Sequence, residues 1–172
     1  MKVGQFFNFE TLKRLATNSE NIDSLMYISV SAFDKMDTYL RENNRSDISA
    51  LLVTGVWIEG LFLATQVVKD NDNPIIRERV GEQGIVLEQL LIVLNHYKKD
   101  KRFFELITEI EKVEAALSEV EIIIEEGEAE MMEVDGVLMA VSSETTTLKM
   151  TDEQLEKIIA VVEDLRDFVI KY

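Results

Sequence analysis

The sequence contains no cysteine, one proline, seven glycines and a single histidine among its 172 residues. The missing cysteine excludes disulfides, thiol catalysis and thiolate metal sites for the chain as given. One histidine cannot supply the paired Glu-x-x-His motifs of a di-iron bundle. The scarcity of glycine and proline, with long stretches rich in Leu, Ile, Glu, Lys and Ala, favours helices over a turn-rich β protein.

Basic residues are also few, and the formal net charge is −15. Twelve acidic residues and only one basic residue, Lys112, lie between Glu105 and Asp135. Such a surface repels nucleic-acid phosphates and anionic lipid headgroups. We therefore expect neither a nucleic-acid partner nor binding to an anionic membrane.

The apolar periodicity predicts an all-α fold, a bundle of five to six helices in a single domain over 1–172. A short irregular or hairpin insertion is expected near 127–149, where an Asp-Gly turn signal interrupts the helical pattern. Helix caps are expected at Ser46, at Asn73 before Pro74, and in a Thr151–Gln154 capping box. The expected helices before that box are Phe9–Thr17, Ile22–Asn43, Ser46–Asp70, Pro74–Tyr97 and Arg102–Glu125.

The helix Ser46–Asp70 is the most unusual segment, because it is apolar on almost every face. A helix of this kind is surrounded by protein or by lipid. We expect it to be the buried centre of the bundle, with Gly55 and Gly60 marking close helix–helix contacts. A direct membrane span is not expected, since Glu59 lies near the middle, where an acidic group costs roughly 2.5 kcal/mol or more.

A search for chemistry yields no catalytic constellation, no metal site and no cofactor motif. His96 is placed to cap the end of a helix, and no nucleophile elbow or glycine-rich phosphate loop is present. Glu59 is the residue with a physical claim to function, because a carboxylate among apolar side chains has a raised pKa unless it meets a cation or several donors. The structural interpretation is that Glu59 accepts hydrogen bonds from a helix end or an arginine. The functional interpretation is that Glu59 contacts a ligand or partner beside Trp57.

Several segments together resemble a family of all-helical lipoproteins of Gram-negative bacteria. They are Asn8–Leu12, Asn21–Leu25, Tyr39–Arg45 and Gly55–Thr65, the last containing the Trp-Ile-Glu-Gly core of the resemblance. The family has no established activity. The resemblance implies an extracytoplasmic, lipid-anchored protein. Its members carry a signal peptide, an acylated cysteine and further N-terminal helices, so the chain is interpreted as a shortened form that lacks them.

Three functions are consistent with these patterns. The first is a non-enzymatic helical module, periplasmic or anchored to the outer membrane in its full-length form, that binds a protein partner or forms a homo-oligomer. Surplus apolar segments at 6–7, 122–124 and 137–141 support it. The second is a hydrolase or lyase that uses carboxylates alone, with Glu59 as the general base. The third is a cytoplasmic helical scaffold.

Overall fold

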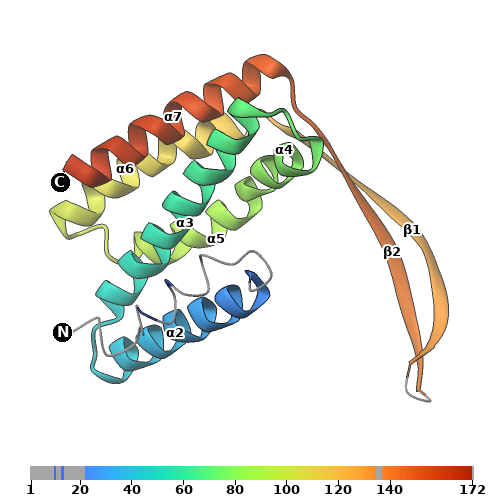
Figure 1. The fold of residues 1–172 in the computed structure, drawn as a ribbon, viewed down its shortest axis with the longest axis horizontal. Helices are drawn as coiled ribbons and strands as arrows, with labels where there is room; N and C mark the ends of the chain where they lie inside the picture. The colour runs from blue at the N-terminus through green and yellow to red at the C-terminus, as the bar shows by residue number, and fades with distance from the viewer. Residues whose placement is uncertain (1–9, 11–12, 14–21, 135–136, 172) are drawn as a thin grey trace. The chain divides into compact units, whose positions relative to one another are not determined.

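The computed structural model describes residues 22–134 and 137–171, together with Glu10 and Lys13. These residues are predominantly helical, as the sequence predicts, and also include one antiparallel strand pair (Figure 1). The expected helix Phe9–Thr17 lies, apart from Glu10 and Lys13, outside the described residues. The elements in chain order are α2 (Ile22–Glu42), α3 (Ser46–Asp70), α4 (Pro74–Gly81), α5 (Gln83–Asn95), α6 (Lys101–Leu117), β1 (Glu121–Val134), β2 (Val137–Lys149) and α7 (Asp152–Lys171).

The chain divides into two compact units, Met1–Gly55 and Val56–Tyr172, with the boundary inside α3. In the first unit, α2 and the start of α3 are joined by a tight turn at 43–45. Asn44 adopts a left-handed backbone conformation with φ of 56°, which asparagine tolerates better than most residues. The backbone N–H of Arg45 closes the turn on the Leu40 carbonyl at 2.8 Å. The predicted helix–turn–helix boundaries are therefore confirmed to within a residue.

The second unit has α6 and α7 side by side (Figure 1). The beginning of α7 bonds to the segment directly after α6, since Gln154 donates to the Glu119 carbonyl at 2.6 Å, so the two helices are antiparallel. Their apolar stripes meet those of α4 and α5 in a common core. The largest fully buried side chains of this core are Val80, Leu87, Leu94, Ile110, Val113, Ile158, Val162 and Leu165.

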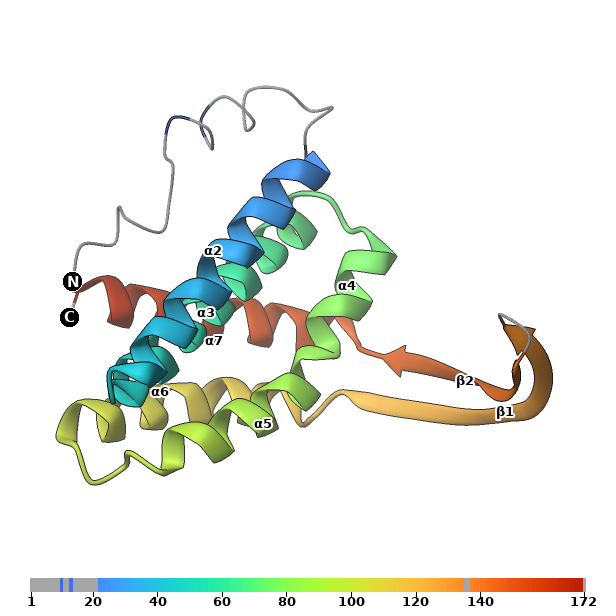
Figure 2. The same ribbon diagram turned by 90° about the horizontal axis from the view of Figure 1, so that it is seen from below.

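The segment after Pro74 is two helices rather than the predicted single one. The helix α4 ends at Gly81, Glu82 separates it from α5, and Figure 2 shows the change of direction between them. A Cβ atom added at Gly81 would collide with the side chain of Leu148, on β2. The close approach of a distant strand thus coincides with the break, and the local apolar pattern carries no sign of it.

The predicted insertion near 127–149 is a hairpin that begins earlier, at Glu121. The predicted helix Arg102–Glu125 is correspondingly wrong at its end, because α6 stops at Leu117. Three consecutive isoleucines, 122–124, follow, and β-branched residues favour strands because their χ1 angle is restricted in helices. The antiparallel register runs from Glu121 opposite Lys149 to Val134 opposite Val137, with an irregularity between Glu126 and Ala129.

The helix α3 is not buried on every side, contrary to the expectation. Ile58, Leu61, Thr65 and Val68 form its buried side, whereas Val56, Leu63 and Val67 are 44%, 56% and 46% exposed. The residues of the exposed side recur at helical spacing with Gly60 between them. Added Cβ atoms at Gly55 and Gly60 would meet nothing within 4 Å, so the predicted close contacts at these glycines are also wrong.

Within the described part of the chain, α3 is the one helix long and apolar enough to cross a membrane by length and composition. The core helix of a water-soluble protein passes the same test. About 33% of its most apolar window is buried inside the protein.

Candidate functional site

Glu59 lies on α3 and forms an ion pair with Arg166 on α7. The Arg166 Nε donates to one carboxylate oxygen at 2.8 Å, and a terminal nitrogen donates to the other at 3.0 Å. The guanidinium carbon of Arg166 also lies 4.1 Å from the centre of the Phe62 ring. The predicted arginine partner of Glu59 is therefore present, but the Glu59 side chain is 48% exposed and not buried in the core.

This pair alters the acid–base properties of both groups. The hydrogen bonds from Arg166 hold the pKa of Glu59 below its ordinary value of 4.5. The same contacts raise the pKa of Arg166. A carboxylate whose charged form is stabilised is a weaker base, so the geometry does not prepare Glu59 for proton abstraction.

A second polar contact lies further along the same two helices. Glu163 on α7 accepts hydrogen bonds from Gln66 at 2.9 Å and from Lys69 at 2.7 Å. These contacts lower the pKa of Glu163, with Lys69 the largest cause. We call the contact residues Glu59, Phe62, Gln66 and Lys69 of α3 with Glu163 and Arg166 of α7 the α3–α7 seam. Their spacing places them along one stripe of each helix, and the seam joins the two helices.

Trp57 contacts a different helix. Its indole N–H donates to the Gln83 side-chain oxygen at 3.1 Å, and the Gln83 amide donates to the Arg79 carbonyl at the same distance. Trp57 therefore connects α3 to the junction of α4 and α5, whereas Glu59 connects it to α7. The structure does not bring Trp57 and Glu59 together around one cavity.

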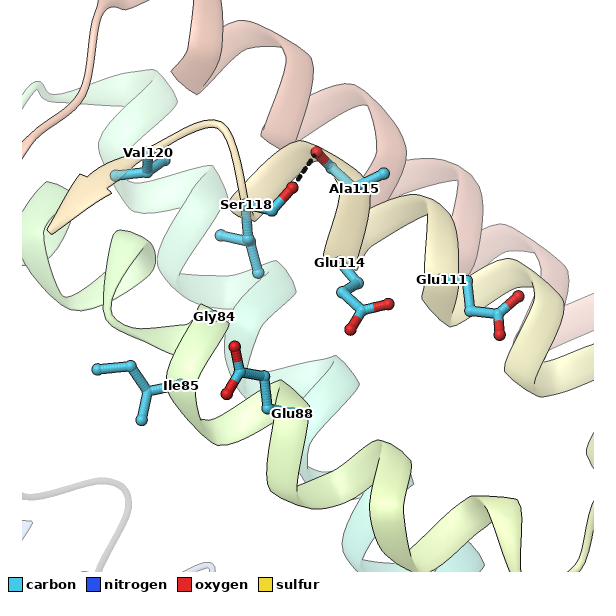
Figure 3. A pocket seen from close by; sticks show the side chains of 9 residues that line it. Gly84, Ile85, Glu88, Glu111, Glu114, Ala115, Ser118 and Val120 are labelled. Atoms are coloured by element: carbon cyan, nitrogen blue, oxygen red, sulfur yellow. Dashed lines mark hydrogen bonds between the residues drawn. The ribbon is translucent and has the colours of Figure 1, made fainter.

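A shallow pocket between α5 and α6 has a volume of about 410 Å³ and lies apart from both residues (Figure 3). Its lining includes Glu88 of α5, Glu111 and Glu114 of α6, and the apolar residues Ile85 and Leu117. The acidic run between Glu105 and Asp135, which contains Glu111 and Glu114, is evident in the sequence, whereas its neighbour Glu88 on α5 is not, since that depends on how the helices pack. The pocket carries negative charge, and within the described residues no group of three or more His, Cys, Asp or Glu is placed to hold a metal ion.

His96, which the sequence places at a helix end, is the C-cap residue of α5. Its Nδ1 lies 2.8 Å from the Ile92 carbonyl, so the ring occupies the helix end that the sequence predicts. No buried side-chain polar atom in the described part of the chain lacks a hydrogen-bond partner. The buried polar side chains in this part of the chain are therefore hydrogen-bonded within the protein.

No protein-family model, curated protein or solved structure matches this chain.

Proposed function

We propose that this protein is a non-enzymatic helical module that binds a protein partner through the exposed side of α3. The observation that carries the proposal is the α3 outer stripe, defined as Val56, Gly60, Leu63 and Val67. Its three apolar side chains are 44–56% exposed on the side of the helix opposite to Ile58, Leu61 and Thr65. An apolar helix face of this kind is typical of an interaction surface.

The stripe has a shape suited to a second helix. Gly60 lies at its centre with open space around the position of a Cβ atom, which leaves a notch between Val56 and Leu63. Small residues at such positions allow the backbone of a partner helix to approach closely. Large apolar residues on both sides of the notch provide the area to be buried.

The α3–α7 seam, on a different side of α3 from the outer stripe, favours a protein environment over lipid. The seam ties this helix to α7 through two carboxylates, one arginine and one lysine. Charged groups on a helix are costly inside a bilayer. We therefore propose that α3 packs in a single helical bundle of five or six helices rather than crossing a membrane.

The carboxylate-only hydrolase or lyase finds less support. Its general base would be Glu59, whose pKa is lowered and whose two oxygens both accept bonds from Arg166. The extracytoplasmic location remains a proposal that depends on the lipoprotein resemblance.

The interaction surface is tested by photo-crosslinking in cells of the source organism. A photoreactive phenylalanine analogue is placed at Leu63, and the matched control carries it at Ile75, which is 67% exposed on α4. We expect a discrete crosslinked product from position 63 and none from position 75. Absence of a product at positions 56, 63 and 67 alike would contradict the proposal.

A further inference from the structure

The hairpin formed by β1 and β2 is attached to the helices at its base. Leu148 packs against the backbone of α4 at Gly81, which leaves no room for a Cβ atom there. Arg77 of α4 donates to the Met150 carbonyl at 2.9 Å and to the Asp152 carboxylate at 2.7 Å, and its side chain is only 17% exposed. Lys157 of α7 pairs with Glu119, which lies two residues before β1 begins. The base of the hairpin is therefore held in place by α4 and α7.

Beyond that base, the ladder has two strands in the part of the chain that the structure describes. Each strand has one hydrogen-bonding edge paired within the hairpin and one edge without a strand partner there. A lone two-stranded sheet is marginally stable in water, and an open edge is a template for a further strand. A hairpin of 14 and 13 residues offers a long template of this kind.

The two open edges differ sharply in charge. The strand β1 carries six glutamates and no basic residue. The strand β2 carries one glutamate and one lysine, and its first seven residues, 137–143, are uncharged and contain neither glycine nor proline. Charged residues block edge pairing, whereas uncharged segments of high β-propensity promote it. The acidic strand β1 is thus protected from pairing, and β2 is the available edge.

We propose that β2 pairs edge to edge with β2 of a second copy of this chain. The product is a four-stranded antiparallel sheet in the order β1, β2, partner β2, partner β1. Pairing through the two β1 edges would bring twelve glutamates together, and like charges on neighbouring strands destabilise a sheet. Pairing of β2 with a partner β1 is head-to-tail, so each added copy leaves another β2 edge open to the next copy and the assembly does not close as a dimer. The symmetric β2 pair is the arrangement that closes and keeps the acidic strands outside.

A cysteine scan tests the pairing directly, because the 172-residue sequence has no cysteine. Single cysteines are placed along β2 from Leu138 to Leu148, and the matched controls are placed at their register partners on β1, such as Ala129 opposite Ser142. Neighbouring antiparallel strands bring facing Cα atoms to about 5 Å, which a disulfide spans. We expect disulfide-linked dimers with a maximum at one β2 position and none on β1. Dimers linked through β1, or none on β2, would overturn the proposal.

A charge variant gives an independent result in solution. Val141 lies opposite Glu130 and Thr145 opposite Glu125, so the double variant Val141→Lys with Thr145→Lys adds cross-strand ion pairs that preserve the hairpin while charging the β2 edge. The control swaps the same positions neutrally, Val141→Thr with Thr145→Val. By analytical ultracentrifugation of the full chain, we expect a dimer whose dissociation constant rises at least tenfold in the lysine variant and stays unchanged in the control. A monomeric parent chain, or a dimer indifferent to the lysines, would refute β2 pairing and point to another protein or surface.

Discussion

Arg166 donates two hydrogen bonds to the Glu59 carboxylate, at 2.8 and 3.0 Å, and its guanidinium carbon lies 4.1 Å from the centre of the Phe62 ring. The planar guanidinium can make both contacts at once because its edge meets the carboxylate and its face meets the ring. Arg166 is therefore the residue through which α7 orients the middle of α3. Because the same helix presents the outer stripe on another side, this contact also orients the proposed binding surface.

Replacing Arg166 by lysine should lower the thermal midpoint by a few degrees, nearly as much as replacement by alanine. A lysine ammonium keeps the charge but loses the bidentate hydrogen bonds to Glu59 and the stacked contact with Phe62. The measurement is thermal unfolding followed by circular dichroism. The control is Arg79→Lys, since the exposed side chain of Arg79 pairs with Glu82 three residues along the chain and, within the described residues, joins no two helices through an aromatic contact that an ammonium would lose. Equal midpoints for the two lysine variants would contradict the assigned role.

The seam also predicts how stability depends on pH. The pKa of Glu59 is lowered by Arg166 and that of Glu163 by Lys69 and Gln66. A carboxylate with a lowered pKa stabilises the folded state above its ordinary pKa, and this contribution disappears as the pH falls through the folded-state value. Stability should therefore decline as the pH falls below the ordinary value of 4.5.

The double variant Glu59→Gln with Glu163→Gln should flatten this decline. Urea-unfolding midpoints measured between about pH 6 and pH 3 give the comparison. The variant should be less stable than the parent near neutral pH, and the two curves should converge in acid. Parallel curves would mean that these carboxylates do not govern acid unfolding.

Local signals in the sequence predicted much of the fold. Asn73 accepts hydrogen bonds from the N–H groups of Ile75 and Ile76, and Thr151 and Gln154 form the reciprocal capping box. A donor for Glu59, either a helix end or an arginine, was predicted from the cost of an unpaired carboxylate, and Arg166 supplies it although Glu59 is half exposed. Each of these predictions concerns a residue and its immediate chemical needs, which is why sequence alone was sufficient.

The predictions that failed depended on contacts between distant segments. The break at Glu82 coincides with the approach of Leu148 to Gly81, and nothing near residue 81 indicates it. An apolar helix indicates that its surface will be covered, but not by what, so α3 was wrongly predicted to be enclosed by this chain. The different neighbours of Trp57 and Glu59 likewise follow from helix packing, not from their closeness in sequence.

Substituting Gly81 by alanine should destabilise the protein by about 1 kcal/mol, because the cost of displacing the end of the Leu148 side chain exceeds the gain in helix propensity. Chemical denaturation measures the change. In a Leu148→Ala background the added methyl group has room, and the same substitution should become much less costly. An equal cost in both backgrounds would show that the contact with Leu148 is not responsible.

Gly60→Ala should have the opposite effect on the isolated chain. A Cβ atom at Gly60 meets nothing within 4 Å, so alanine should stabilise α3 by about 0.5–1 kcal/mol through its higher helix propensity. The same methyl group fills the notch of the α3 outer stripe and should reduce crosslinking from position 63 if a partner helix approaches there. Gly55→Ala serves as the control, since it lies off the stripe and should stabilise the helix without changing the crosslink. A stabilised chain with undiminished crosslinking would place the partner away from Gly60.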